Sequence, residues 1–354
     1  MEYRTLGRSG LKVSAISMGT FTFGGQGPFA MVGSQGVSDA KRLVDCCIDN
    51  GVNVFDTANM YSTGLSEQIL GEVLEGRRDN VLVTSKARMR IGDGPNDEGV
   101  SRYHLIRECE KTLRNLRTDH IDIYYMHEWD GVTPVEEKMA ALDTLVTQGK
   151  VRYVGCSNYS GWHIMKSLQA SERDRRVRFV TQQIHYTLEA REAEYELLPI
   201  SVDQGLGVLV WSPLAAGLLS GKHTRHTPVA KGSRQDAGWT EPPIRDQGRL
   251  WDIVDVLVSV GEKHGVEAAQ VALAWLLTRP AVSSLVVGGS SEQQFTNNFR
   301  AIDLKLDDED LKQLDLVSQP PLIYPYWHQG QFARDRFSDG DWALHDRAGK
   351  NALS

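Results

Sequence analysis

Four residues whose side chains could act together in proton transfer occur within the first 127 positions. Asp56 and Tyr61 lie in the stretch Asp-Thr-Ala-Asn-Met-Tyr, Lys86 ends Thr-Ser-Lys, and His127 ends Met-His. A tyrosine has a pKa of about 10 and donates a proton poorly at neutral pH unless its anion is stabilised. A lysine ammonium nearby would lower that pKa, an aspartate would hold the ammonium in place, and a histidine could share the proton. The set indicates acid–base chemistry, although a rim salt bridge with a core Tyr and a core His would also explain it.

Each of these residues stands at or just beyond the end of a predicted strand. Runs with β-branched and aromatic residues predict strands over 53–58, 81–86 and 121–127. The C-terminal ends of parallel strands meet at one rim of a barrel, and the active sites of (β/α)8 barrels lie on that rim. The pattern therefore predicts a site at the C-terminal rim of a parallel barrel.

The rest of the chain alternates strands and helices as such a barrel requires. A hairpin with strands 3–6 and 11–14 comes first, and further strands are expected over 15–20, 151–158, 180–186, 207–214 and 284–288. Helices are expected over 39–50, 66–76, 101–116, 135–148, 161–170, 192–204, 250–264, 267–279, 292–302 and 307–317. Ser66 is expected to cap its helix. The fold class is α/β: a (β/α)8 TIM barrel in a single domain, 1–354, with an N-terminal β-hairpin and extra helices.

The motifs at the strand ends resemble those of the aldo-keto reductase superfamily, in the branch that includes bacterial aldo/keto reductases and potassium-channel β-subunit-like proteins. The matching pieces occur in the family's order and span most of the chain. They are Asp56 to Tyr61, Thr84 to Lys86, Met126-His127, Gly155 to Asn158, Gln183 to Tyr186, Trp211 to Leu214 and Gly288 to Ser291. The resemblance implies that the hairpin closes the bottom of the barrel. It also implies that the C-terminal segment, 318–354, lies over the pocket, whereas a packed tail with a frayed end is the simpler alternative.

The resemblance implies reduction of aldehydes or ketones to alcohols by direct hydride transfer. No side chain can supply hydride, so a nicotinamide cofactor is needed, and the protein must supply an acid near the developing alkoxide. Carried over residue by residue, Tyr61 is the general acid/base and Lys86 is its electrostatic activator. Asp56 is the anchor of that lysine, and His127 orients the substrate.

The expected cofactor is NADPH, with NADH as the alternative. Ser157, Asn158 and Gln183 resemble the set that binds the nicotinamide carboxamide, and Trp211 occupies the position of a ring stacked under the nicotinamide. Helix capping by Ser157 and Asn158 and a core position for Trp211 are the alternatives. The other expected cofactor contacts are Gly19, Thr20 and Asp56, then Ser212, Leu214, Gly217, Ser220 and Lys222 in a pyrophosphate loop, and Gly288, Ser290, Ser291, Gln294 and Asn298 at the adenosine end. Many NADPH-preferring relatives carry an arginine close to the position of Ser290, where this chain has only serines.

Aromatic and apolar residues near the predicted rim suggest a pocket with few charges for a small carbonyl substrate. The expected lining is Phe21, Phe23, Met60 and Trp129. A surface position on a loop is the alternative for Trp129. The glycine-rich loop 23–36 contains no GxGxxG pattern and is expected to lie over the pocket mouth.

Composition narrows the function classes. The chain has 354 residues, 41% of them hydrophobic and 24% charged, with a net charge of −7 and no basic block, so no nucleic-acid partner is expected. No stretch has the length of a membrane span, and the N-terminus lacks the apolar segment of a signal peptide, so no membrane partner and a cytoplasmic location are expected. Four cysteines without a CxxC pair indicate reduced thiols, and His223, His226 and Asp236 are too irregularly spaced to predict a metal site.

Two other functions fit the same residues. A nicotinamide-sensing regulatory protein with slow turnover, like the channel β-subunits, would keep the same cofactor site. Alcohol oxidation with NADP would use the same chemistry in reverse. The oligomeric state and the identity of the carbonyl substrate are left open by the sequence.

Overall fold

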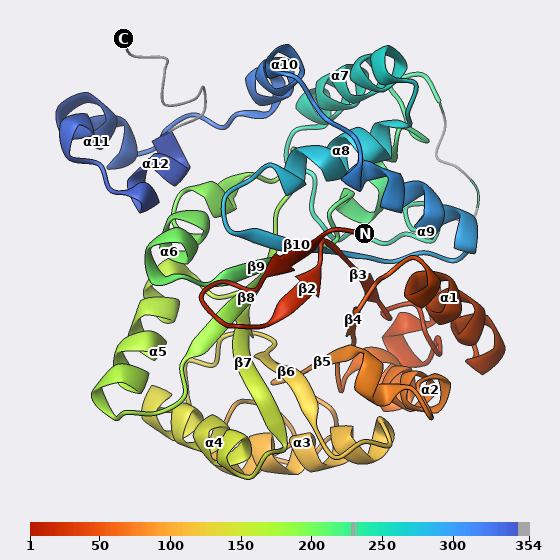
Figure 1. Ribbon diagram of the computed structural model, residues 1–354, viewed down its shortest axis with the longest axis vertical. Helices are drawn as coiled ribbons and strands as arrows, with labels where there is room; N and C mark the ends of the chain where they lie inside the picture. Colours follow the sequence, from red (N-terminus) through yellow and green to blue (C-terminus); the bar gives the residue numbers. More distant parts are fainter. Residues whose placement is uncertain (228–230, 232, 346–354) are drawn as a thin grey trace.

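Eight parallel strands close into a barrel, as predicted, in the order β10–β3–β4–β5–β6–β7–β8–β9 (Figure 1). This computed structural model describes residues 1–227, 231 and 233–345. The strands are β3 (Ile16–Gly19), β4 (Val54–Asp56), β5 (Leu82–Ala87), β6 (Ile121–Met126), β7 (Val151–Ser157), β8 (Phe179–His185), β9 (Gly207–Trp211) and β10 (Val282–Val287). Asp56 pairs with Thr84 on β5, and Lys86 pairs with Tyr125 on β6. This register places the ends of β4, β5 and β6 on one rim.

Helices surround the barrel. The inner ring consists of α1 (Val37–Asp49), α2 (Leu65–Val73), α3 (Arg102–Asn115), α4 (Val135–Thr147), α5 (Gly161–Arg173), α6 (Leu197–Gln204), α8 (Ala268–Leu277) and α9 (Glu292–Phe299). Two extra helices, α7 (Gln247–His264) and α10 (Asp308–Ser318), pack against each other, and α7 also packs on α8 (Figure 1). In the described part of the chain, no helix combines the length and the apolar character that a membrane crossing requires.

The N-terminal hairpin closes one end of the barrel, as the resemblance implied. Its strands β1 (Tyr3–Thr5) and β2 (Lys12–Ser14) are antiparallel. Buried Leu6 and Val13 belong to the same cluster as interior residues of the barrel, including Val54. Gly7 has φ +55°, and an added Cβ there would lie 2.4 Å from the carbonyl oxygen of Gly205, so only glycine lets the turn approach the barrel this closely.

The predicted capping role of Ser66 is wrong. Helix α2 begins at Leu65 with Gly64 as the N-cap, because Gly64 adopts φ +96° and turns the chain into the helix one residue earlier. Ser66 is buried in the first turn, where its hydroxyl donates to the carbonyl oxygen of Thr20 at 2.9 Å and lies 3.1 Å from the Thr57 hydroxyl. It therefore ties α2 to the ends of β3 and β4.

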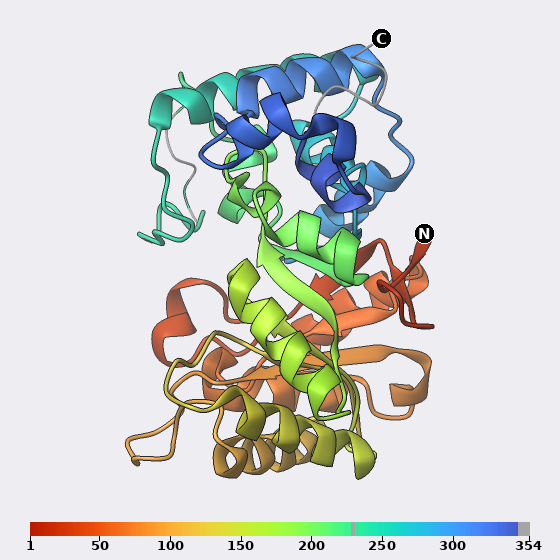
Figure 2. The same cartoon turned by 90° about the vertical axis from the view of Figure 1, so that its left-hand side faces the viewer.

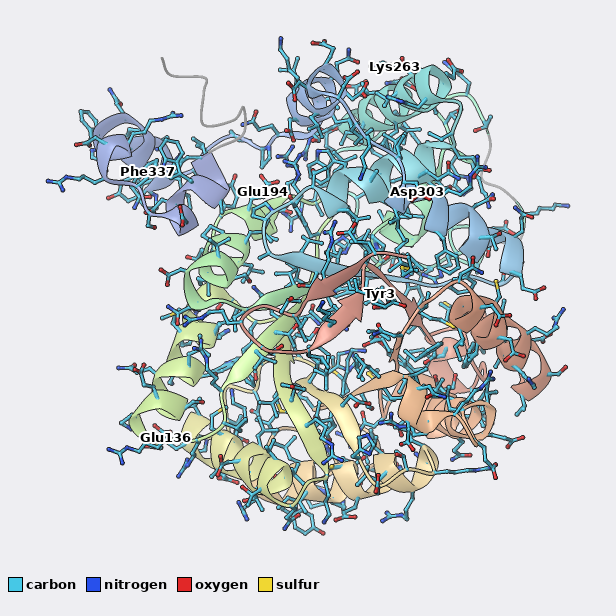
Figure 3. The ribbon with its side chains drawn as sticks, viewed as in Figure 1. Tyr3, Glu136, Glu194, Lys263, Asp303 and Phe337 are labelled. Atoms are coloured by element: carbon cyan, nitrogen blue, oxygen red, sulfur yellow. The ribbon has the colours of Figure 1, made fainter. Side chains whose placement is uncertain are left out.

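The C-terminal segment lies along the flank of the barrel. It contains α11 (Tyr326–Phe332) and α12 (Asp339–His345), and α12 packs on α6 (Figure 2). Tyr326 stacks on Tyr195 with ring centroids 5.4 Å apart, just before α6. In Figure 3 the labelled Phe337 marks this segment at the periphery, far from Tyr3 on the hairpin. The part of 318–354 that reaches His345 thus covers α6 and not the pocket, while 346–354 lie outside the described residues.

Candidate active site

A buried ion pair forms the base of the candidate site. Asp56 ends β4, Lys86 lies near the end of β5, and the Lys86 Nζ is 2.6 Å from the Asp56 Oδ2, with both residues almost fully buried. The ammonium also donates to the carbonyl oxygen of Thr57 at 2.9 Å. The second carboxylate oxygen accepts from Thr84 Oγ1 at 2.5 Å and from Gln183 Nε2 at 2.8 Å. A buried ion pair is tolerated when its remaining hydrogen-bonding capacity is satisfied, and these bonds satisfy it.

Tyr61 is held over this ion pair by a strained turn. The Lys86 ammonium donates to the Tyr61 hydroxyl at 3.4 Å. The next two residues, Ser62 and Thr63, have φ of 48° and 57°, in the left-handed region that costs non-glycine residues energy. The Ser62 hydroxyl donates to the carbonyl oxygen of Phe23 at 2.7 Å and accepts from Gly25 N–H at 3.0 Å. The glycine-rich loop therefore fixes the turn that positions Tyr61.

His127 completes the set from the end of β6. Its ring centroid lies 5.9 Å from that of Tyr61 at an interplanar angle of 75°. Its carbonyl oxygen accepts from Asn158 Nδ2 at 3.1 Å, which links the ends of β6 and β7. Its Nδ1 is buried and has no hydrogen-bond partner in the described part of the protein. The fold thus brings Asp56, Tyr61, Lys86 and His127 together, as the sequence predicted.

Burial and charge set the protonation states of these groups. Burial raises the pKa of Tyr61, and the neighbouring Lys86 ammonium offsets this only in part, so the expected net lowering of that pKa by Lys86 is not found. Burial opposes the charge on Lys86, but Asp56 and Tyr61 outweigh burial and raise the Lys86 pKa. Burial and the Lys86 charge hold the His127 pKa well below its ordinary value. At neutral pH the site therefore holds a phenol, an ammonium and a neutral imidazole.

The buried His127 should make the protein less stable in mild acid. Because its folded-state pKa is depressed, the unfolded chain binds a proton below about pH 6.5 that the folded chain does not bind. The free energy of unfolding should therefore fall as the pH decreases from 6.5. Urea unfolding between pH 5 and 7.5 should show a smaller decrease in His127→Asn than in the wild-type protein. An equal decrease in both proteins would show that other groups cause it.

The residues predicted to hold the nicotinamide lie at the ends of β7, β8 and β9. The Ser157 hydroxyl is buried without a hydrogen-bond partner in the described part of the protein, as expected of a group that awaits a ligand. The Gln183 amide nitrogen donates to Asp56, and the Asn158 amide oxygen accepts from Trp211 Nε1 at 3.0 Å. These two amides therefore have structural bonds that the sequence did not predict. Trp211 also lies 4.5 Å from the ring of His185, which fixes its indole at the rim.

The predicted pyrophosphate and adenosine contacts lie on the loops after β9 and β10. Trp211 pairs with Val286, so the two loops leave the same rim. The Gln294 Oε1 accepts from the Ser290 backbone N–H at 2.7 Å and from the Ser290 hydroxyl at 3.2 Å, and the Ser291 hydroxyl caps α9 by accepting from the Gln294 backbone N–H. The first loop carries Ser212, Leu214, Gly217, Ser220 and Lys222, the second carries Gly288, Ser290 and Ser291, and Gln294 and Asn298 follow on α9. Gly19 ends the neighbouring β3 and Thr20 follows it, and Thr20 N–H donates to the carbonyl oxygen of Asp56 at 2.9 Å.

The predicted substrate-facing residues do not share one environment. The ring of Phe21 meets that of Tyr61 edge-on at 5.0 Å, so Phe21 borders the site. Phe23 is fully buried in the hydrophobic core and cannot line an open pocket. Trp129 stacks on His163 at 3.9 Å and packs against Tyr159 at 5.1 Å, towards α5. Met60 precedes Tyr61 and is partly exposed.

The structure adds three residues that the sequence did not single out. Phe29 and Trp239 meet Phe21 edge-on at 5.2 and 5.7 Å, which brings two long loops together beside Tyr61. Arg234 lies over the same ring, with its Cζ 5.7 Å from the centroid. Its Nη2 lies 3.8 Å from where a Cβ would stand at Gly288. No ion pair joins Arg234 to a carboxylate in the described part of the chain, and burial lowers its pKa. Phe29 lies between β3 and α1, and Arg234 and Trp239 lie between β9 and α7. These stretches lack the hydrophobic periodicity that would have predicted which way their side chains point.

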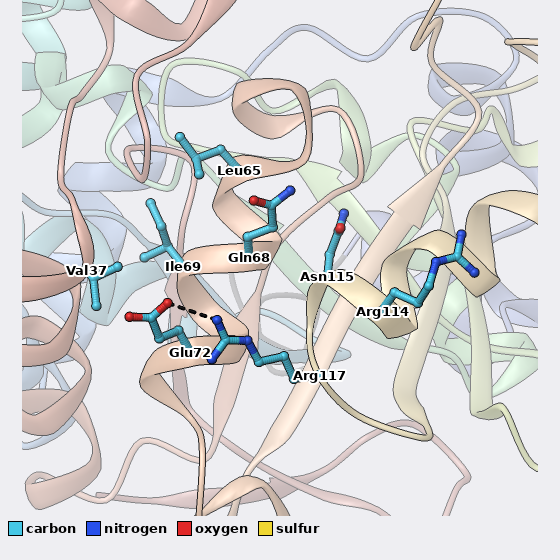
Figure 4. Close-up of a pocket in the computed structure, with 8 residues that line it drawn as sticks. All are labelled: Val37, Leu65, Gln68, Ile69, Glu72, Arg114, Asn115 and Arg117. Atoms are coloured by element: carbon cyan, nitrogen blue, oxygen red, sulfur yellow. Dashed lines mark hydrogen bonds and ion pairs between the residues drawn. The ribbon is translucent and has the colours of Figure 1, made fainter.

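A separate hollow between α2 and α3 has no part in this site. It measures about 350 Å³ and is crossed by an ion pair of 3.1 Å between Arg117 and Glu72 (Figure 4). Its lining is Val37, Leu65, Gln68, Ile69, Glu72, Arg114, Asn115 and Arg117. None of the four residues of the candidate site borders it.

A model of the Aldo/keto reductase family matches residues 15–319, which include the barrel and the whole candidate site. The chain belongs to the aldo/keto reductase family. It is 38% identical over 332 residues to an uncharacterized oxidoreductase, YrpG, of Bacillus subtilis (strain 168), covering 91% of this chain and 97% of the relative. It is also 35% identical over 312 residues to two proteins named as probable voltage-gated potassium channel β-subunits, from Arabidopsis thaliana and Oryza sativa subsp. japonica. Each of these matches covers 86% of this chain and 92% of the relative.

Family membership supports an oxidoreductase that acts on small carbonyl compounds, in a family that typically uses NAD(P)H.

Proposed function

We propose that the protein reduces aldehydes or ketones to alcohols with NADPH, using Tyr61 as the general acid. The observation that carries this proposal is the Tyr61 hydroxyl 3.4 Å from a buried Lys86 ammonium, which is itself paired with Asp56 at 2.6 Å. Burial keeps the phenol protonated, and the ammonium stabilises the phenolate that remains after proton transfer. The buried Ser157 hydroxyl, which has no hydrogen-bond partner in the described part of the protein, suits the carboxamide of a nicotinamide. The Trp211 indole, held by its bond to Asn158, suits the nicotinamide ring.

The bound nicotinamide would supply hydride to the carbonyl carbon. Tyr61 gives its proton to the carbonyl oxygen as negative charge develops there, so that the product is a neutral alcohol. Lys86 lowers the energy of the resulting phenolate, and Asp56 keeps Lys86 in position. Neutral His127 donates a hydrogen bond to the same oxygen and so orients the carbonyl. Phe21 shields the acid from water on one side.

Arg234 supplies the cation that the sequence lacked near Ser290. Its guanidinium lies beside Gly288, at the start of the predicted adenosine loop, and has no carboxylate partner in the described part of the chain. Arginine binds phosphate through charge-assisted hydrogen bonds. We therefore expect Arg234→Leu to weaken NADPH binding by about 10- to 100-fold while changing NADH binding little, since one charged hydrogen bond contributes about 1.5–3 kcal/mol. Fluorescence titration with both nucleotides measures this, and equal weakening of both would place Arg234 at the pyrophosphate instead.

The function is tested by following absorbance of the reduced nicotinamide. Purified protein is mixed with NADPH or NADH and with a panel of aldehydes, ketones and keto-sugars. Carbonyl-dependent cofactor oxidation with repeated turnover is expected, faster with NADPH. Failure to bind either nucleotide would overturn the proposal.

A second candidate follows from the relatives named as probable channel β-subunits. A nicotinamide-sensing regulatory protein would need the same cofactor contacts but little turnover. Tight binding of NADPH without turnover of any carbonyl on the panel, together with a stable complex with a membrane protein, would favour this function over the reductase.

A further inference from the structure

Lys138 is a buried lysine that the proposed reaction does not use. It lies on α4 with 1% of its surface exposed, and its ammonium donates to the Ser167 hydroxyl at 2.9 Å and to the Tyr159 hydroxyl at 3.2 Å. The Nζ also lies over three aromatic rings, 4.9 Å from the centroids of Trp129 and Tyr159 and 5.4 Å from that of Phe179. No carboxylate pairs with it within the described ranges. Aromatic rings thus replace the usual counter-ion of this amine.

Burial without an ion pair makes the charge on Lys138 costly. Desolvation lowers its pKa from 10.5 to about 8, because the nearby Cys156 and Asp130 offset only part of that cost. The amine therefore changes charge just above neutral pH. Tyr159 and Phe179 are held in the core, whereas Trp129 is only partly buried and so has more freedom to respond.

Other ionisable groups lie near the amine or its rings. They are Cys156 on β7, Tyr159 after β7, His163 and Lys166 on α5, Glu128 and Asp130 after β6, and Arg88 after β5. Burial raises the pKa of Cys156 to about 12 and that of Tyr159 well above 10, and it lowers the pKa of His163 from 6.5. A transition near pH 8 is therefore expected from Lys138 and not from these three groups.

The Lys138 ammonium contacts residues of two loops of the candidate site, the loop after β6 and the loop after β7. Trp129 follows His127 by two residues, and its backbone carbonyl accepts from Arg88 Nε at 3.3 Å. Tyr159 directly follows Asn158, whose side chain bonds to the His127 carbonyl oxygen and to Trp211. Two of the three rings that contact the ammonium, Trp129 and Tyr159, therefore belong to the same two short loops that carry the predicted substrate-orienting and carboxamide-binding residues, whereas Phe179 begins β8.

We propose that Lys138 is a positioning residue whose ammonium holds Trp129 and Tyr159, and with them the loops of His127 and Asn158, in the arrangement that accepts the carbonyl substrate. This inference rests on the proposed reductase function. When the amine loses its proton, the cation–π attraction to the rings is lost and Trp129 is released. The substrate affinity should fall, while the chemical step carried out by Tyr61 should change less.

The position of Trp129 can be followed without any catalytic assay. The protein is labelled with 5-fluorotryptophan, and the ¹⁹F resonance of Trp129 is identified by its disappearance in Trp129→Phe. Between pH 6.5 and 9.5 this resonance should shift with a midpoint near 8 in the wild-type protein. Lys138→Met, which keeps the length of the side chain, should remove the shift. The wild-type titration needs only the Trp129→Phe assignment and not the Lys138 variant, so a poorly folded Lys138→Met does not weaken the test.

A matched control is Lys166→Met, because Lys166 lies 6.0 Å from the ring of the exposed Trp162 on α5. This variant should keep the Trp129 shift, with its midpoint moved slightly upward because the Lys166 charge that helps to lower the Lys138 pKa is removed. A Trp129 resonance that does not shift, or that shifts equally in Lys138→Met, would overturn the inference.

The functional part is tested by the pH dependence of KM. For the wild-type protein, KM for the carbonyl substrate should rise about three- to tenfold between pH 7 and 9.5, with a smaller change in kcat, as expected for loss of a partly desolvated cation–π contact. In Lys138→Met, KM should be nearly independent of pH over this range. The same rise in both proteins would overturn the positioning role. Failure of the proposed reductase function is distinguishable, because it would appear as no turnover at any pH while the ¹⁹F titration remained measurable.

Discussion

Replacing Tyr61 by phenylalanine is expected to abolish carbonyl reduction and to leave cofactor binding intact. The change removes only the hydroxyl that the Lys86 ammonium contacts at 3.4 Å, and the aromatic packing against Phe21 is kept. General acid catalysis contributes about 10²- to 10⁴-fold to a rate, so kcat should fall by at least about 100-fold. The affinity for NADPH, measured by fluorescence titration, should stay within about threefold of wild type, since loss of one weak contact is worth about 0.5 kcal/mol.

Tyr125→Phe is a matched control. Tyr125 is a buried tyrosine of β6, and its hydroxyl lies 3.3 Å from that of Thr181. The control should keep wild-type kcat. Comparable losses in both variants would mean that the rate depends on core packing and not on an acid at position 61. A Tyr61→Phe protein with wild-type kcat would require a different proton donor.

Lys86→Met is expected to cause the largest loss of stability among the variants considered, together with loss of activity. The substitution keeps most of the side-chain volume but leaves the Asp56 carboxylate buried without its counter-ion. Removal of one partner of a buried ion pair costs about 3–5 kcal/mol. The bonds that Asp56 accepts from Thr84 and Gln183 place the expected loss towards the lower end of that range. Urea unfolding measures the stability, and the absorbance assay measures the activity.

A double variant separates charge from packing. Asp56→Asn combined with Lys86→Met removes the isolated charge, so it should be more stable than Lys86→Met alone while remaining inactive. Lys41→Met removes an exposed lysine whose ammonium lies 2.7 Å from the partly exposed Asp45 carboxylate, which Arg77 also pairs with, and it should leave stability nearly unchanged. If Lys86→Met is as stable as the wild-type protein, the Asp56–Lys86 pair is not the buried ion pair described above.

The sequence alone determined the barrel and the meeting of Asp56, Tyr61, Lys86 and His127. Alternating strand and helix patterns allow few arrangements other than parallel strands, and parallel strands carry their C-terminal ends to one rim. Residues at or just beyond the C-terminal ends of β4, β5 and β6 are therefore neighbours in space whatever the details of packing. The N-terminal hairpin was also predictable, for a different reason: a short turn between residues close in sequence defines it.

Only the tertiary structure decided the features that depend on long loops, on burial or on side-chain direction. Phe29, Trp239 and Arg234 reach the site from loops with no periodicity that would predict their direction. The Tyr61 pKa depends on how far burial outweighs Lys86, and the bond from Gln183 to Asp56 depends on how β8 faces β4 across the barrel.

The positions of the C-terminal segment and of Lys138 could likewise not be predicted from local sequence patterns. Aromatic residues such as Tyr326 can pack on any apolar surface, and the fold offers them Tyr195 beside α6 and not the pocket mouth. Lys138 occupies a helix position that sequence patterns would assign to solvent, and only the packing of α4 against α5 and β7 encloses its ammonium in aromatic rings. Local patterns fix which strands and helices form. The contacts between residues distant in sequence decide what surrounds each charge.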